Sequence, residues 1–76
     1  MITPVQVKMA RVALGLGVRD LAAAADVAPS TIMRFESGRG GLQARTLDRV
    51  QRTLEAGGIS FIAEDASGGP GVRIRV

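Results

Sequence analysis

The stretch LAAAADVAPSTIMRFESGR, residues 21–39, describes two short helical segments with a brief break between them. The first belongs to a helical stripe that starts at Val18, and its four consecutive alanines leave room for a close neighbour. Pro29 disfavours helical backbone at the residue before it and fits the first turn of a new helix. Ile32 and Phe35 give this second helix an inward face. We therefore expect two helices joined by a short turn over residues 18–37.

The residues of the break have the properties that such a turn requires. Asp26 stands where the backbone is often left-handed, and Asp tolerates that conformation better than most residues. Ala22 is placed where the two helices would cross, and Val27 would fill the turn. Two helices of this kind inside a larger helical domain are typical of a helix-turn-helix.

Two further helices flank this pair. Residues 3–6, TPVQ, combine an N-cap, a proline at the first helical position and a glutamine that completes a capping box. Apolar residues then recur as in an amphipathic helix, and Gly15 and Gly17 end it. That stripe comprises Val5, Met9, Val12, Ala13 and Leu16. The fourth helix carries Leu47, Val50 and Leu54 and stops at residues 57–58, two glycines.

In the last part of the chain, the spacing of apolar residues changes from the helical pattern to the alternating pattern of strands. Residues 59–63 resemble a strand, and residues 72–76, VRIRV, alternate strictly between apolar residues and arginine. The turn-forming residues 64–71 between them predict a β-hairpin. The expected fold is mainly α, with a helical domain over residues 1–58 and a hairpin over residues 59–76.

Composition limits the classes of function. The chain has 76 residues, of which 46% are apolar, so it is one small domain. It contains no cysteine and no histidine, which excludes disulfides, thiol chemistry and Cys/His metal sites. We expect no enzyme, no cofactor and no metal, and a reducing, cytoplasmic setting. No apolar run approaches the roughly 20 residues of a membrane span, so we expect no membrane partner.

The net charge of +3 is unevenly distributed. Nine of the ten cationic residues are arginine, whose planar fork suits phosphates and guanine edges. The whole excess lies in residues 1–57, whereas residues 58–76 are neutral. A GC-rich genome also favours arginine, so the positions of the arginines matter more than their number.

Residues 21–39 resemble the Cro-and-repressor-type (XRE-like) helix-turn-helix regulators. The likeness also covers residues 11–16, RVALGL, and residues 46–47, TL. It implies a four-helix, lambda-repressor-like DNA-binding domain whose second motif helix enters the major groove. It also implies an ion pair between Arg11 and Glu36, which joins the first helix to the end of that recognition helix.

The resemblance assigns DNA contacts by position. Arg34 is the candidate for reading guanine, and Arg39 with Gly40 lies in the loop that meets the phosphate backbone. Val18 replaces the glutamine that often binds phosphate in this family, and Arg19 beside it can substitute. The expected DNA-binding residues are Arg19, Ala28, Pro29, Ser30, Thr31, Met33, Arg34, Arg39, Gly40 and Arg45.

These features predict a sequence-specific transcriptional regulator, a repressor, that binds a palindromic operator in double-stranded DNA as a homodimer. The hairpin is the expected dimer element, because its apolar face is too large for a lone hairpin in water. Its residues are Ile59, Phe61, Val72, Ile74 and Val76. The same face can instead pack on the first and fourth helices. Two other functions stay open: an activator, and an antiactivator or antitoxin-like protein that binds a protein partner with this fold.

Overall fold

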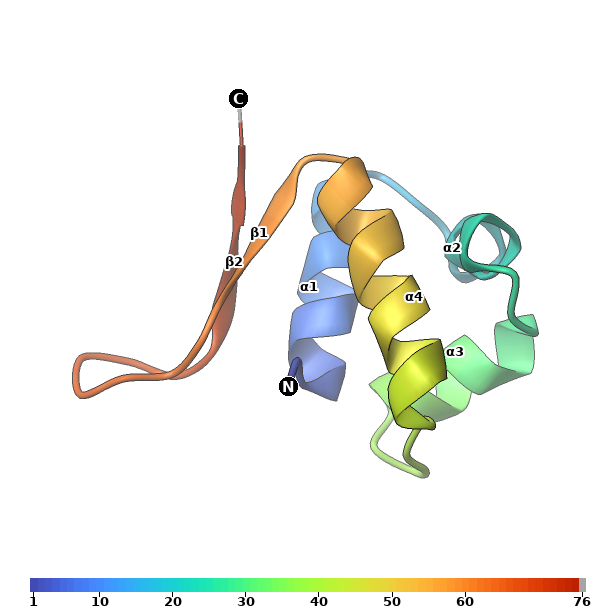
Figure 1. The fold of residues 1–76 in the computed structure, drawn as a ribbon, viewed down its shortest axis with the longest axis horizontal. Helices are drawn as coiled ribbons and strands as arrows, with labels where there is room; N and C mark the ends of the chain where they lie inside the picture. The colour runs from blue at the N-terminus through green and yellow to red at the C-terminus, as the bar shows by residue number, and fades with distance from the viewer. Residues whose placement is uncertain (76) are drawn as a thin grey trace.

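The computed structural model describes residues 1–75 and contains four helices followed by a two-stranded antiparallel hairpin. The elements are α1 (Pro4–Ala13), α2 (Val18–Ala25), α3 (Pro29–Glu36), α4 (Ala44–Ala56), β1 (Ile59–Ile62) and β2 (Gly71–Ile74). The helices form one cluster, and the hairpin stands beside α1 with its loop projecting away from them (Figure 1). The predicted mainly α fold with a C-terminal hairpin is confirmed.

The ends of α1 follow the sequence signals. The backbone N–H of Thr3 donates to Gln6 Oε1 at 2.9 Å, and the N–H of Gln6 donates to Thr3 Oγ1 at 3.2 Å. This is the predicted capping box, with Pro4 as the first helical residue. Beyond the C-terminal end, Gly15 has a φ of +71°, a left-handed conformation that favours glycine.

The turn between α2 and α3 depends on Asp26. Its φ of 59° and ψ of 51° are left-handed, as predicted, and no other non-glycine residue within 1–75 has a positive φ. The N–H of Val27 then donates to the carbonyl of Ala22 at 2.9 Å, which closes the end of α2. Ala22 is only 1% exposed, and α2 packs against α3 at this point. The predicted helix-turn-helix is therefore present.

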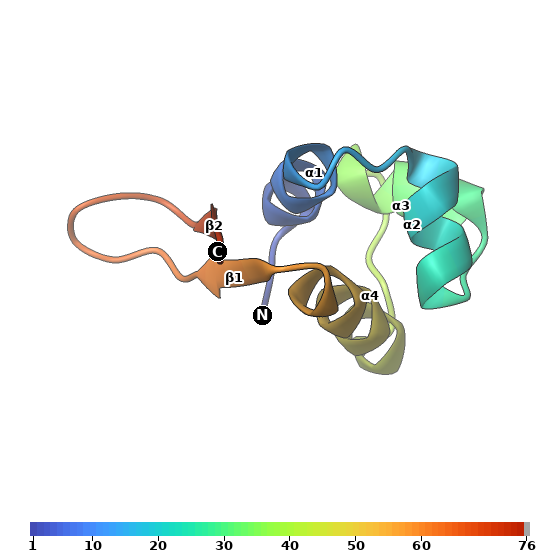
Figure 2. The same ribbon diagram turned by 90° about the horizontal axis from the view of Figure 1, so that it is seen from above.

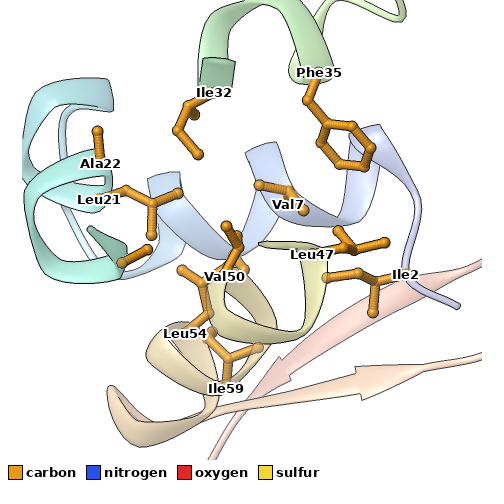
Figure 3. Close-up of a cluster of buried hydrophobic side chains, with 12 residues drawn as sticks. Ile2, Val7, Leu21, Ala22, Ile32, Phe35, Leu47, Val50, Leu54 and Ile59 are labelled. Carbon is orange, nitrogen blue, oxygen red and sulfur yellow. The ribbon is translucent and has the colours of Figure 1, made fainter. Parts of the chain in front are cut away.

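The core lies where the four helices and the start of β1 meet (Figure 3). Val7 from α1, Leu21 from α2, Ile32 from α3 and Val50 from α4 are each 0% exposed. Ile59 from β1 is 1% exposed and belongs to the same cluster. The helices and the hairpin therefore share one core.

Most of the apolar stripe predicted for the first helix is not in the core: Val5, Val12 and Ala13 face solvent and Met9 is half-buried, whereas Leu16 packs against the core. Val5 is 61% exposed and Val12 is 60% exposed, while the buried residues of α1 are Gln6, Val7 and Ala10. Apolar residues lie on both sides of this helix, and the longer series was not the one that packs. The side of α1 that packs on the core instead contains Gln6, Val7 and Ala10. A glutamine can be buried there because the hairpin supplies hydrogen-bond acceptors for its side chain.

Gln6 is the polar residue that makes this arrangement stable. Its side chain is buried, and Nε2 donates to the carbonyls of Ile62 and Gly71, each at 2.9 Å. These two residues face each other across the hairpin, so one amide joins α1 to both strands. With Oε1 bound to the N–H of Thr3, every polar group of the side chain has a partner.

The hairpin packs on the helices of its own chain. Ile59 pairs with Ile74, and Phe61 pairs with Val72, so these four residues share one face. β1 contacts α4 and β2 contacts α1 (Figure 2). Three of these residues contribute to or pack against the core, whereas Ile74 is 54% exposed. The sequence left open whether this face meets the helices or a second chain, and the structure shows it on the helices.

The last residues of the chain include Val76 and two arginines. Val76, expected in the dimer element, lies outside the described residues. Arg73 and Arg75 are both exposed, and charged side chains of this kind protect an edge strand from pairing. The guanidinium of Arg75 also donates to the carbonyl of Glu55 near the end of α4.

Arg11 and Glu36 form the ion pair that the resemblance implied. Arg11 Nε donates to Glu36 Oε2 at 2.8 Å, and Arg11 Nη2 donates to Glu36 Oε1 at 2.9 Å. The side chains are 13% and 7% exposed, and Arg11 Nη1 also donates to the carbonyl of Leu16 at 3.0 Å. The hydrogen bond to Glu36 raises the pKa of Arg11 above its ordinary value, against the effect of burial. One side chain thus joins α1, the loop after it and the end of α3.

Replacing Arg11 by alanine should lower the free energy of unfolding by about 3 kcal/mol, because it leaves the Glu36 carboxylate nearly buried and unpaired. Urea unfolding of the full chain measures this. Arg52 is the matched control, since it forms an ion pair with Asp48 at 2.9 Å on the exposed side of α4. Arg52→Ala should cost less than about 0.5 kcal/mol. Equal effects of the two substitutions would contradict the role given to Arg11.

Candidate nucleic-acid interface

The outward face of α3 carries most of the predicted DNA contacts. Burial of Ile32 and Phe35 fixes the rotation of this helix, so the intervening residues face solvent. Met33 is 55% exposed and Arg34 is also exposed. At the start of the helix Ala28, Pro29 and Ser30 are exposed, and Thr31 is half-buried. The structure therefore brings all six of these predicted residues to one short helix.

Arg34 lies across the loop that follows its own helix. A Cβ built on Gly40 would lie 3.6 Å from Arg34 Nη2, so the guanidinium passes over this glycine. Both residues line a hollow between α3 and the start of α4, together with Thr31, Gln43 and Thr46. Within residues 1–75, Arg34 forms no ion pair. Its five N–H donors are therefore available for an acceptor outside the chain.

Arg39 is held at the end of α3. Gly38 ends the helix with a φ of +76°, and the N–H of Arg39 then donates to the carbonyl of Arg34 at 3.0 Å. Arg39 Nε donates to Ser37 Oγ at 3.1 Å, and that hydroxyl donates to the carbonyl of Arg34 at 3.1 Å. The guanidinium is exposed and hydrogen-bonded beside the end of α3, where it can reach an acceptor outside the chain.

The start of α4 borders the same hollow. Arg45 is exposed in the first turn. Gln43 is the N-cap, and its side chain makes no capping hydrogen bond, so the first N–H groups of the helix lack a side-chain acceptor. Such groups attract an anion. Gln43 and Thr46 are not among the predicted DNA-binding residues, although polar residues that precede an apolar stripe are a signal for a helix start.

Unlike the start of α4, the start of α2 already has a carboxylate at its backbone N–H groups. Arg19 is exposed there, as predicted. Asp20 Oδ2 accepts the backbone N–H of Gly17 at 2.8 Å, so a carboxylate already occupies the N-terminal end of α2. A phosphate at that end would meet this negative charge. Arg19 is thus the group of this helix that can attract the DNA backbone.

A second hollow lies on the other side of α3. It is lined by Lys8, Arg11, Val18, Met33, Glu36, Ser37 and Arg39. The start of α2 and the loop after α3 therefore meet beside Met33. Exposed cationic residues flank the outer face of α3 on both sides, with Arg39 at this hollow and Arg45 beside the other.

The remaining arginines of α4 have other surroundings. Arg49 Nη2 donates to the carbonyl of Asp26 at 3.4 Å, and Arg52 is paired with Asp48.

Within residues 1–75 no three His, Cys, Asp or Glu side chains come together as a metal site would require. In the same part of the chain, none of the helices is long and apolar enough to span a membrane.

Comparison with known proteins agrees with this geometry. A family model described as a helix-turn-helix domain matches residues 5–59, well over half of the chain, and the match extends from α1 to the first residue of β1. No curated protein matches the sequence. Because the model covers the helical core and the turn described above, the chain belongs to the helix-turn-helix domain family of XRE-like DNA-binding regulators.

Proposed function

We propose that the protein is a sequence-specific transcriptional regulator that binds a palindromic operator as a homodimer and represses transcription. The observation that carries the proposal is the outer face of α3, where Met33 and Arg34 are exposed between two hollows and Arg34 has no ion pair within residues 1–75. Occupying an operator is sufficient for repression when it excludes other proteins from the same DNA.

Arg34 is the residue to which we assign sequence readout. A bidentate contact to the O6 and N7 atoms of guanine is worth about 1–3 kcal/mol of discrimination. Met33 and Ala28 offer apolar contact to a thymine methyl group, and Ser30 and Thr31 offer hydroxyls. Pro29 offers no side-chain hydrogen bond, so the shape of the DNA contributes to recognition.

The backbone contacts are assigned to the groups around α3. Arg39 and the backbone at Gly40 meet one phosphate, Arg45 and the free N–H groups of α4 meet another, and Arg19 meets a third. Few phosphates per chain means modest affinity for one half-site, since each neutralised phosphate adds roughly 0.9 to the salt slope. Two copies bound to one operator together give the higher affinity that a single copy lacks.

Substituting alanine for Arg34 and for Arg39 should reduce DNA affinity in different ways. A duplex selected from a random library by the wild-type chain serves as the specific site, and a scrambled duplex serves as the reference. Arg34→Ala should weaken binding to the selected duplex by roughly 5- to 150-fold and leave the scrambled duplex nearly unchanged. Arg39→Ala should weaken both duplexes alike and lower the salt slope by about 0.9.

Fluorescence anisotropy over a salt series measures both effects. Arg52→Ala is the control, because this arginine lies on the exposed side of α4 and pairs with Asp48. An Arg34→Ala variant that keeps the full preference for the selected duplex would contradict the assignment.

For the homodimer, we propose the unpaired edge of β2 and the exposed Ile74 as the contact. An edge strand presents N–H and C=O groups that a second strand can pair. Ile59, Phe61 and Val72 pack on their own chain, so in this proposal they support the hairpin from inside.

Ile74→Asp should convert the dimer to a monomer in sedimentation experiments, because the charge would be buried between two chains. The variant should still fold, since the side chain is 54% exposed within one chain. Ile62→Asp is the matched control: Ile62 is 38% exposed and, by strand alternation, lies on the opposite face of the hairpin. A dimer that survives Ile74→Asp would place the interface elsewhere.

A further inference from the structure

The outward side of α1 is an apolar surface that neither the core nor the candidate DNA interface uses. Its residues are Val5, Met9, Val12 and Ala13, and we call it the α1 outer face. Val5 and Val12 are 61% and 60% exposed. Val5, Met9 and Val12 are spaced i, i+4 and i+7, so they form one ridge along the helix. Small soluble proteins rarely expose a continuous apolar surface without a function for it.

The surroundings of this face form a shallow groove. It is lined by Val5, Lys8, Met9, Val12, Ala13 and Glu36. In Figure 2, α1 lies at the margin of the helical cluster, between the hairpin and α3. The hairpin is attached to α1 through Gln6, on the buried side of the helix. The α1 outer face therefore stays open after the chain has folded.

The charge beside the groove is positive. Lys8 is exposed and, within residues 1–75, has no carboxylate within salt-bridge distance. Glu36 lines the same groove, but its side chain is 7% exposed and both of its oxygens accept hydrogen bonds from Arg11. The surface that complements this groove has apolar side chains and a carboxylate opposite Lys8.

A second copy of the chain does not meet that requirement. In a two-fold interface the same surface lies on both subunits. Lys8 and Met9 are the middle of α1, so antiparallel packing of two α1 helices would place Lys8 near its symmetry mate. Like charges at that distance repel. A helix of ten residues is also only about 15 Å long, which gives less area than a stable dimer needs but enough for a short helical peptide.

We propose that the α1 outer face docks an amphipathic helix of another protein, with apolar anchors on one side and acidic residues beside them. The anchors would lie along Val5, Met9 and Val12, and the flexible Met9 side chain would adapt to their shape. A carboxylate of the partner would pair with Lys8. This gives the protein a contact to a second protein on a surface centred on α1, which shares Lys8 and Glu36 with the hollow beside Met33.

A pair of synthetic peptides tests this with the full chain. One peptide has about four helical turns with leucine at the anchor positions and glutamate beside them, and the other carries lysine at each glutamate position. The titrations contain no DNA, to which the basic peptide would itself bind, and use about 0.15 M salt to screen the exposed arginines around α3. Anisotropy should show that the acidic peptide binds and that the basic peptide binds at least roughly fivefold more weakly.

Two variants then locate the contact. Val12→Asp should weaken binding of the acidic peptide by roughly tenfold or more, and Lys8→Glu should reverse the preference between the peptides. Arg52→Glu makes the same charge change on α4 and should alter neither affinity. Thermal unfolding of each variant verifies the fold.

Three results would overturn the proposal: neither peptide binds, both peptides bind equally, or Lys8→Glu leaves the preference unchanged. A fourth would assign the face to a second copy of the chain, namely a wild-type dimer that Val12→Asp dissociates while Ile74→Asp does not.

Discussion

The ion pair between Arg11 and Glu36 fixes the position of α3, the helix to which we assign DNA readout. α3 is only eight residues long, and isolated helices of that length are not stable in water. Its core contacts, Ile32 and Phe35, set the rotation of the helix. The two parallel hydrogen bonds from Arg11 then hold its last turn against α1, and the third bond of the same guanidinium holds the loop after α1. These contacts together set the orientation of the exposed face of α3 that carries Met33 and Arg34.

Gln6 performs a similar task for the hairpin. A lone two-stranded hairpin is marginal in water, but this one places Ile59 in the helical core and has two carbonyls bound by the amide of Gln6. The hairpin is therefore a part of the folded unit, and its remaining free features are the edge of β2 and Ile74. The helices and hairpin together leave two different open surfaces, a cationic one around α3 and an apolar one along α1.

Much of the fold follows from local sequence. The capping box at Thr3, the left-handed Asp26 and the break at Pro29 each act within a few residues, so the helix ends and the turn were predictable. Arg11 and Glu36 are distant in sequence, and only the family resemblance indicated their pairing. The exposed residues of α3 followed from the inward positions of Ile32 and Phe35.

The side of α1 that is buried could not be predicted in the same way. Apolar residues lie on two sides of this helix, and local periodicity favoured the longer series. The choice depends on Gln6, whose burial is stable only because carbonyls more than fifty residues away accept its hydrogen bonds. The path of Arg34 over Gly40 and the carboxylate of Asp20 at the start of α2 are likewise consequences of the folded loops.

The central claim is that this domain reads DNA with α3 and keeps α1 free. Amide chemical shifts of the labelled full chain, followed while the selected duplex is added, test this most directly. The largest changes should occur at Arg19 and in residues 28–34, 38–41 and 43–46, with the amides of Val5, Met9 and Val12 nearly unchanged. Changes centred on α1 or on the hairpin, with α3 unaffected, would contradict it.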